Sequence, residues 1–303
     1  MLSKLFKNFK KKDFILEDFY TTDLHSHLIP AIDDGVKSLE ESIEIIKNMK
    51  SLGYKKIIST PHIMSHKYPN KRDNILEGYD LVKNELIKQN IDIEFEVAAE
   101  YYFDEYFIEK IREKDLLTLK GNYVLFELSY TSTPFGLEQV VYELLQNGYK
   151  PILAHPERYT YYSNSLEKYN SLKDLGLYFQ INLNSLHKFY GMKPKIAAEY
   201  LVNNGLVDFV GSDIHSMRYF DSLKSFMQTG KLSEVFEKNQ IKNSFIWFFQ
   251  YLFSIYFYST CHFHNHNHSL HHNHSHIYLQ SQHHLGWFLY GCESVLYLVY
   301  LSS

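Results

Sequence analysis

The sequence predicts a parallel α/β barrel, and two observations carry the prediction. Short apolar runs at 19–24, 56–60, 93–99, 123–126, 151–154, 178–183 and 207–212 alternate with stretches of helical period. Strands that alternate with helices favour a parallel sheet. Each run also ends in a polar residue, usually one of a metal-binding type. Seven such units, with residues of metal-binding type at the carboxyl ends of most strands, favour a closed barrel, because the functional sites of barrel proteins lie at that end of the strands.

The helices are expected at 39–52, 73–89, 104–112, 137–146, 166–175, 194–203 and 234–242. The first of them opens with Ser38 and Glu41, which have the spacing of a capping box. Four of the helices are followed by a glycine, the residue that helix ends favour: Gly53, Gly148, Gly176 and Gly205.

The predicted site centres on residues 23–35. His25 and His27 are two apart at the end of a strand, so they point to one face and can share an ion. Asp34 follows in a turn with Gly35. A His-x-His pair alone is a weak signal, but the other strand ends add ligands. The full candidate set is His25, His27, Asp34, His62, Glu100, Glu127, His155, Asp213 and His215.

This donor set favours a cluster of two or three divalent ions. Imidazole and carboxylate ligands without thiolate suit Mn, Fe or Zn rather than a structural zinc. Such a cluster can bind a phosphate and activate a water for its hydrolysis. Arg158, three residues after His155, is expected to bind phosphate oxygens, against the alternative of an ordinary surface arginine. No Gly-rich phosphate loop with lysine is present, which argues against a nucleoside triphosphate enzyme.

Composition divides the chain into three segments: 1–19, 20–243 and 244–303. The first is basic and is expected either to fray or to lie on an anionic membrane surface. Residues 20–243 contain no cysteine, which indicates a cytoplasmic protein and excludes a cysteine-dependent phosphatase. The net charge of −4 gives no reason to expect nucleic acid as a partner.

The third segment is an atypical apolar and His-rich tail. It holds ten of the seventeen histidines and both cysteines, yet no Lys, Arg, Asp or Pro. Three interpretations stay open. Residues 245–258 and 285–301 are apolar enough for two short membrane segments, the His/Asn run at 261–276 has a metal-binding composition, and the whole tail has the character of a frameshifted translation without a fold. We expect the tail to lie outside the folded domain.

The motifs, taken as an ordered set, resemble one family. They are DLHSHLIPAIDDG at 23–35, STPH at 59–62, AAE at 98–100, FEL at 126–128, AHPER at 154–158 and GSDIH at 211–215. Over about residues 20–220 they look like the PHP-superfamily protein-tyrosine phosphatases of capsule and exopolysaccharide loci, the CpsB/YwqE type. The departure from that family is the tail, because its members usually end near the equivalent of Lys242.

The resemblance implies a distorted (β/α)7 barrel, the PHP fold, with three ions that are usually manganese. It places metal ligands at all nine candidate positions, and implies that His25, His27, Glu127 and Asp213 share one ion. Arg158, Asp34 and His62 are the expected catalytic residues, with Arg218 as a second candidate arginine. The implied substrate is a phosphotyrosine cluster on the tail of a bacterial tyrosine kinase that controls polysaccharide export.

Three other functions compete with this one. A histidinol-phosphate phosphatase would share the superfamily. An amidohydrolase also begins with His-x-His, but typically has eight strands and a lysine where Glu127 stands. A metal-binding membrane protein is the non-enzymatic alternative, and it rests on the tail alone.

Overall fold

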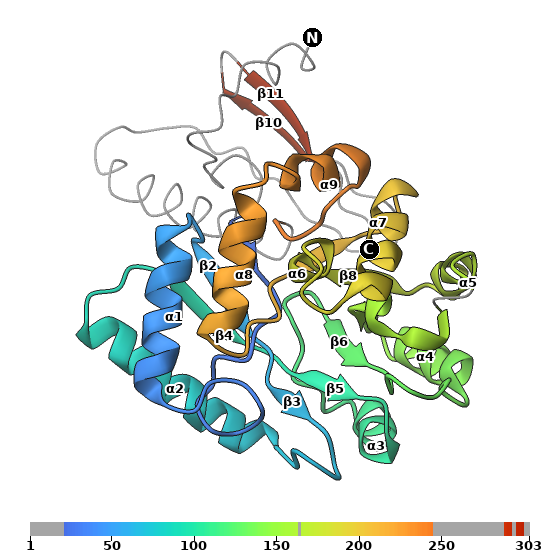
Figure 1. The fold of residues 1–303 in the computed structure, drawn as a ribbon, viewed down its shortest axis with the longest axis horizontal. Coiled ribbons are helices and arrows are strands. Elements are labelled where there is room, and N and C mark those ends of the chain that lie inside the picture. The colour runs from blue at the N-terminus through green and yellow to red at the C-terminus, as the bar shows by residue number, and fades with distance from the viewer. Residues whose placement is uncertain (1–20, 163–164, 245–287, 293–294, 300–303) are drawn as a thin grey trace, which may run out of the picture. The chain divides into compact units, whose positions relative to one another are not determined.

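The computed structural model describes residues 21–162, 165–244, 288–292 and 295–299. Parallel strands and surrounding helices make up the part between residues 21 and 244 (Figure 1). Its strands are β1 (Thr22–Asp23), β2 (Lys56–Ser59), β3 (His62–Ile63), β4 (Glu94–Val97), β5 (Glu100–Tyr102), β6 (Tyr123–Glu127), β7 (Lys150–Ala154), β8 (Tyr178–Asn182) and β9 (Phe209–Gly211). All seven predicted runs therefore contain strand.

The strands form two sheets in which every pair is parallel. One has the order β1-β2-β4 and the other the order β3-β5-β6-β7-β8-β9. Two predicted runs, 56–60 and 93–99, are each followed by a second short strand that was not predicted: after a break at Pro61, β3 follows β2, and after a break at residues 98–99, β5 follows β4. Proline has no N–H for the sheet ladder, which accounts for the first break. The structure confirms the mixed α/β class with parallel sheets.

Side chains alternate between two packing layers along these strands, as the two-residue period of a strand requires. One face contributes to a small cluster that includes Leu24, Ile58, Leu125, Ile152 and Phe209, which come from different strands or their ends. Residues of the opposite face, such as Phe126 and Leu153, belong to a larger cluster that also contains the apolar faces of the helices. Both faces of the strands are thus packed against apolar side chains, which fixes the position of the strand ends.

The helices are α1 (Leu39–Ser51), α2 (Arg72–Lys88), α3 (Glu105–Glu113), α4 (Leu137–Gln146), α5 (Lys168–Asp174), α6 (Leu183–Leu186), α7 (Met192–Asn203), α8 (Met217–Met227) and α9 (Leu232–Lys238), with 3-10 turns η4 (Pro156–Arg158) and η5 (Thr160–Tyr162). Six of the seven predicted helices correspond to α1, α2, α3, α4, α5 and α7, and their ends agree with the prediction within two residues. The seventh corresponds to α9, which begins two residues earlier than predicted and ends four residues before the predicted Lys242. Helices α6 and α8 were not predicted.

The predicted capping box of α1 is only half formed. Ser38 accepts a hydrogen bond from the Glu41 amide, as a cap should. The Glu41 carboxylate, however, accepts from the Lys37 amide and not from that of Ser38. The side chain of Glu41 therefore caps the helix one residue further out than the motif predicts.

The chain divides into two compact units, Met1–Phe253 and Ser254–Ser303. In the second, the described residues form one antiparallel pair, β10 (Phe288–Cys292) with β11 (Val295–Val299). The basic segment 1–19, the run 261–276 and most of the two apolar stretches of the tail lie outside the described residues. Among those that are described, no helix is both long and apolar enough to cross a bilayer. The three-segment division stays a prediction.

Candidate metal centre

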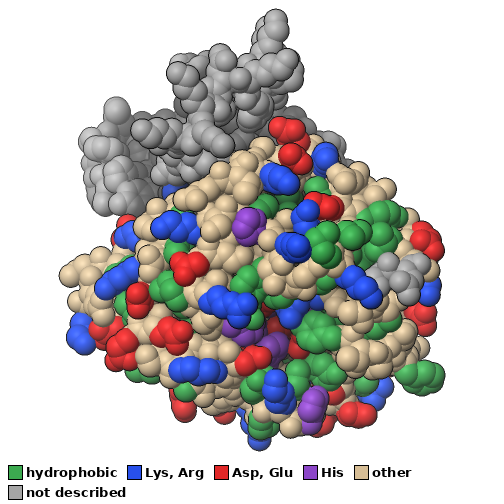
Figure 2. Space-filling model, viewed as in Figure 1, with side chains coloured by type: hydrophobic (Ala, Val, Ile, Leu, Met, Phe, Trp, Pro, Cys, Tyr) green, Lys and Arg blue, Asp and Glu red, His purple; other side chains and the backbone are tan. Residues whose placement is uncertain are grey.

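The nine predicted ligands meet at the carboxyl ends of the strands. His25, His27 and Asp34 lie in the segment after β1, His62 and Glu100 begin β3 and β5, and Glu127 ends β6. His155 follows β7, and Asp213 and His215 follow β9. Histidine side chains are visible in a hollow on the face that Figure 2 presents, with basic and apolar side chains around it. The hollow has a volume of about 120 Å³ and is lined by several of the ligands, Asp34, His62 and Glu100 among them.

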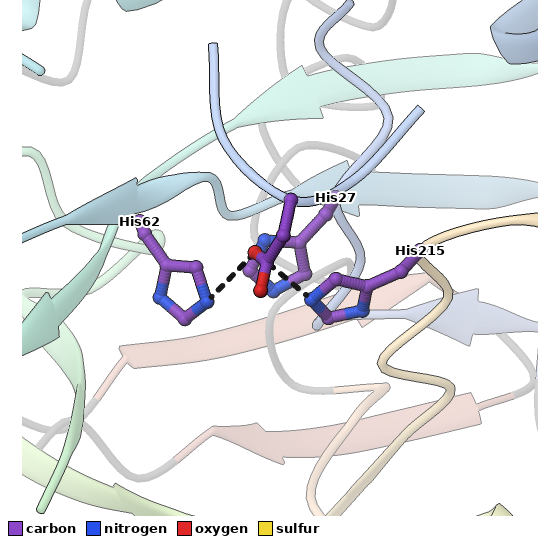
Figure 3. Close-up of side chains that lie close together, drawn as sticks. His27, His62 and His215 are labelled. Carbon is purple, nitrogen blue, oxygen red and sulfur yellow. Dashed lines mark ion pairs between the residues drawn. The ribbon is translucent and has the colours of Figure 1, made fainter. Parts of the chain in front are cut away.

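Four overlapping groups of ligand atoms lie close enough to hold ions. They are His27 with Asp34, His62 and His215; His25 with Glu100 and His155; His25 with His27 and Asp213; and His62 with Glu100 and Glu127. Every one of the nine residues belongs to at least one group. Glu127 groups with His62 and Glu100, and not with His25, His27 and Asp213 as the resemblance implies. Figure 3 shows His27, His62 and His215 converging, with ion pairs from His62 and His215 that meet on Asp34 Oδ1 at 3.4 and 3.5 Å.

Glu100 connects these groups. Its Oε2 atom lies 3.3 Å from Nε2 of His25, 3.3 Å from Nε2 of His27 and 3.2 Å from Nδ1 of His62. Its other oxygen, Oε1, lies 2.9 Å from Nε2 of His155. The side chain is fully buried. Glu100 is therefore the carboxylate best placed to bridge ions.

Three of the imidazoles are oriented by hydrogen bonds on the side away from the cluster. His25 Nδ1 bonds to Gln180 Oε1 at 2.7 Å, His27 Nδ1 to Asp33 Oδ2 at 2.8 Å, and His215 Nδ1 to the carbonyl oxygen of Asp213 at 2.9 Å. Each of those oxygens can only accept, so each Nδ1 donates. In the neutral ring this leaves Nε2 as a lone-pair donor that faces the cluster, the usual arrangement around protein-bound metals.

The turn that carries Asp33 and Asp34 depends on a close backbone approach. A Cβ atom at Gly35 would lie only 2.3 Å from the carbonyl oxygen of His27 and 2.6 Å from its Cβ. Only glycine lets the turn fold back onto the histidine strand. There Asp33 Oδ2 also accepts from the His62 amide at 3.0 Å, which joins two of the ligand-bearing segments.

Two ligand positions have a strained backbone. His155 has φ 33° and Asp213 has φ 51°, in the left-handed region that residues with a Cβ rarely adopt. Such a conformation costs about 1–3 kcal/mol and is concentrated at functional sites, where surrounding structure enforces it. At both positions the chain leaves its strand abruptly, which turns the side chain toward the cluster.

The electrostatics of the cluster favour a cation. Burial alone would lower the pKa of His25, but the carboxylates of Glu100 and Asp213 raise it to about 9. Burial likewise opposes ionisation of Asp33, yet the His27 ring outweighs it and lowers the pKa of Asp33 to about 2. Burial and the charge of Glu100 raise the pKa of Glu127 well above its usual range. The ionised form of Glu127 therefore lacks a compensating positive charge, which a bound cation would supply.

The residues fit a bound metal. Four buried donor atoms have no hydrogen-bond partner among the described residues: Nδ1 of His62 and of His155, Oε2 of Glu100 and Oδ1 of Asp213. Buried polar atoms are rarely left without partners, and two of these, His62 Nδ1 and Glu100 Oε2, lie only 3.2 Å apart, where one ion could serve both. Nitrogen and oxygen donors without sulfur suit Mn, Fe or Zn.

Arg158 lies at the edge of this cluster. Its Nη1 donates to Asp213 Oδ2 at 2.9 Å, and its guanidinium stacks between the rings of Tyr130 at 4.7 Å and Tyr190 at 4.3 Å. Burial would lower the pKa of Arg158, but Tyr130 and Asp213 raise it, so the group stays charged. Arg158 lines the hollow, as predicted for a phosphate-binding arginine.

The structure does not bring Arg218 into the hollow. Arg218 is exposed on α8, and its guanidinium lies 5.2 Å from the centre of the Phe189 ring. The basic residue that joins Arg158 in the lining is Lys67, whose Nζ is 4.0 Å from Asp34 Oδ2. The catalytic role of Arg218 stays a prediction without support from this arrangement.

The positioning residues were not found from the sequence. Asp33 stands beside the predicted Asp34, but nothing in the pattern distinguishes a ligand from a residue that orients one. Gln180 and Asn182 alternate along β8, which places both toward the cluster, and Asn182 Nδ2 donates to Asp213 Oδ2 at 2.6 Å. That two-residue alternation of polar residues in an apolar strand was the available signal.

A parallel α/β fold with buried nitrogen and oxygen ligands at its strand ends is typical of metal-dependent hydrolases. Comparison with known proteins narrows this class. Residues 21–222 match the family described as "Capsular polysaccharide synthesis, CpsB/CapC". The chain therefore belongs to the CpsB/CapC family.

Its relatives agree. The tyrosine-protein phosphatase CpsB of Streptococcus pneumoniae is 32% identical, over 68% of this chain and 86% of its own, and YwqE of Bacillus subtilis is 31% identical, over 65% and 78%. A crystal structure described with YwqE and CpsB as metal-dependent tyrosine phosphatases matches with a TM-score of 0.63 at 28% identity, over 71% of this chain and 89% of that one. The predicted family and its enzyme class, a metal-dependent tyrosine-protein phosphatase, are confirmed.

Proposed function

We propose that this chain hydrolyses phosphotyrosine on a bacterial tyrosine kinase and so regulates capsular polysaccharide synthesis. The observation that carries the proposal is the hollow itself, where seven of the nine metal-type ligands and Arg158 line a space of about 120 Å³ and the other two, His25 and His27, lie within ligand distance of them. A phosphoryl group fits such a space, whereas the aromatic ring of the substrate would remain toward the mouth. Manganese, as three ions, is the proposed cofactor, and the cytoplasm the proposed location.

The ligands divide by position. Glu100 would bridge ions at the centre, with the fully buried His25 and His27 behind it. The other six line the hollow and would complete the set there: Asp34, His62, Glu127, His155, Asp213 and His215. When bound, the ions would polarise the phosphate and make a water more acidic.

The chain's own residues bind and orient the phosphate. Arg158 would donate to phosphate oxygens, and its position is set by Asp213 and by the two tyrosine rings that hold the guanidinium. Burial lowers the pKa of His62 to about 4 despite the charge of Glu100, so its imidazole is neutral near pH 7 and can act as a ligand. The Asp34 side chain is 44% exposed, so it can contact a bound ion and also an incoming substrate.

The barrel is also part of the proposal. Residues beyond β1 and β9 pair with each other, since the Asp213 amide donates to the His25 carbonyl at 2.8 Å and the His27 amide to the Ile214 carbonyl at 2.9 Å. These bonds would close the two sheets into a distorted (β/α)7 barrel around the small apolar cluster. Closure at this point places ligands from the first and last strands side by side.

The test compares substrates on the Mn²⁺-loaded protein. A phosphotyrosyl peptide should be hydrolysed with much higher kcat/KM than histidinol phosphate or a phosphoseryl peptide of the same sequence. Preference for histidinol phosphate would overturn the proposal in favour of the other phosphatase type. An Arg158→Lys variant should lose most activity toward the peptide, because lysine cannot form the bidentate, ring-stacked contact.

A further inference from the structure

A second pocket lies beside the metal hollow and shares two of its walls. It has a volume of about 410 Å³, and its lining includes Tyr130, Arg158, Tyr190, Met192 and Lys193. Tyr130 and Arg158 also line the metal hollow. The stacked Tyr130, Arg158 and Tyr190 side chains therefore form a partition, with the ligand cluster on one side and the second pocket on the other.

The second pocket has a cationic and partly apolar lining. Two of the described residues that line it are basic, and none is Asp or Glu. Arg158 is already paired with Asp213, but no described residue forms an ion pair with Lys193. Lys195, two residues further along α7, shows the contrast, since it pairs with Glu199 at 3.1 Å. Lys193 is thus an exposed cation at the pocket without a counter-charge from the chain.

We propose that this pocket binds an anionic side chain of the substrate peptide, two residues away from the phosphotyrosine. The inference rests on the proposed function, because a peptide must first place its phosphate in the metal hollow. Successive residues of an extended peptide rise about 3.3 Å each and their side chains alternate between faces, so side chains two positions apart lie on one face and can enter two pockets that share a wall. The tyrosine rings and Met192 would contact the aliphatic or aromatic stem, and Lys193 would pair with the charge.

The anionic group has two natural sources, a carboxylate or a second phosphotyrosine. Both would meet the same lysine, but a phosphotyrosine also offers a ring to Tyr130 and Tyr190. The pocket volume accommodates either side chain. The two sources can be separated with peptides that differ at the flanking position alone.

The experiment measures kcat/KM of the full-length, Mn²⁺-loaded protein on phosphotyrosyl peptides that carry Ala, Glu or a non-hydrolysable phosphotyrosine analogue two residues from the target residue, on either side. For the wild type, the ratio of the Glu peptide to the Ala peptide should be roughly 3-fold, the scale of one exposed ion pair. Lys193→Glu should reduce that ratio below 1. The matched control is Lys224→Glu on α8, which changes the net charge equally at an exposed lysine that lines neither pocket.

Each outcome decides the proposal. The proposal is supported if the Glu-to-Ala ratio of kcat/KM falls in Lys193→Glu and is unchanged in Lys224→Glu. If the ratio of the phosphotyrosine-analogue peptide to the Ala peptide exceeds that of the Glu peptide, the phosphorylated side chain is the preferred occupant. Equal efficiency on all peptides, or the same fall in both variants, overturns the pocket while leaving the phosphatase function intact. Failure to hydrolyse any of the peptides would instead contradict the proposed function. Affinity for a non-hydrolysable peptide, measured by fluorescence polarisation, should follow the same order.

Discussion

Asp33 Oδ2 accepts a hydrogen bond from Nδ1 of His27 at 2.8 Å, while the adjacent Asp34 points into the ligand cluster. Two neighbouring aspartates thus have different positions: Asp33 orients the imidazole of a candidate ligand, and Asp34 is itself a candidate ligand. The same Oδ2 atom accepts from the His62 amide, so Asp33 fixes two ligand segments at once.

Asp33→Asn should therefore weaken metal binding without removing a ligand. An amide can present its NH₂ group to His27, which would favour the wrong tautomer, and we expect a loss of about 10- to 100-fold in Mn²⁺ affinity. Isothermal titration calorimetry on the metal-free protein measures this. Asp92→Asn, at an exposed position, is the control. Unchanged affinity in Asp33→Asn would show that the hydrogen bond has no part in binding.

Replacement of the central carboxylate should be more severe. Glu100→Gln keeps the shape but removes the negative charge that faces His25, His27 and His62, and we expect at least a ~100-fold fall in kcat together with lost metal. Glu127→Gln should also cost ~100-fold or more. Metal content and turnover are measured together, with the exposed Glu109→Gln as control. Near-normal turnover with full metal content would remove the replaced residue from the cluster.

Chelation and thiol alkylation should have opposite effects. Residues 20–243 contain no cysteine, so iodoacetamide should leave the phosphatase activity intact, whereas a chelator should abolish it and added Mn²⁺ should restore it. The measurement is hydrolysis of a phosphotyrosyl peptide after each treatment. Activity that survives complete removal of metal would contradict the metal-dependent reaction.

Metal affinity should rise with pH. The pKa of His25 in the metal-free protein is raised to about 9, so the ring is protonated at pH 7 and must lose that proton to bind an ion. Raising the pH toward 9 removes this competition, and apparent Mn²⁺ affinity should increase by up to about tenfold per pH unit for each proton released. Calorimetry at pH 6, 7 and 8 in buffers of different ionisation enthalpy detects both the trend and the protons. An affinity that is flat over this range would argue that His25 is already neutral.

Aromatic residues at the mouth should favour aryl phosphates. Two tyrosines from the loops that follow the strand ends, Tyr68 and Tyr130, line the hollow. The Tyr68 ring stacks on the His62 ring at a centroid distance of 5.5 Å. Tyr68→Leu should lower kcat/KM for an aryl phosphate several-fold more than for an alkyl phosphate of similar leaving-group pKa, because stacking with the substrate ring is lost. Tyr102→Leu, outside the hollow lining, is the control. An equal loss for both substrates would leave Tyr68 as scaffold.

Helix α8 shows where local pattern was insufficient. Its buried residues have helical spacing: Phe220, Leu223, Phe226 and Met227. The helix begins only two residues after His215, however, and the strand-end motif there gave no sign that a helix follows directly. The breaks between β2 and β3 and between β4 and β5 likewise follow from the tertiary path, since β3 and β5 pair in a different sheet from β2 and β4. Interruptions of this kind depend on how neighbouring strands pair, which no single segment encodes.

The sequence by itself predicted the alternation of strands and helices and the nine candidate ligand positions, because side-chain period and strand-end chemistry are local properties. Only the tertiary structure decided which ligands meet, for His25 and Glu100 are 75 residues apart in sequence, yet their Nε2 and Oε2 atoms lie 3.3 Å apart. It also gave Glu100 the central place and Asp33 and Gln180 their orienting roles, and it set Arg158 between two tyrosine rings. These are relations between chain segments brought together by packing, so they exist only once the strands have assembled.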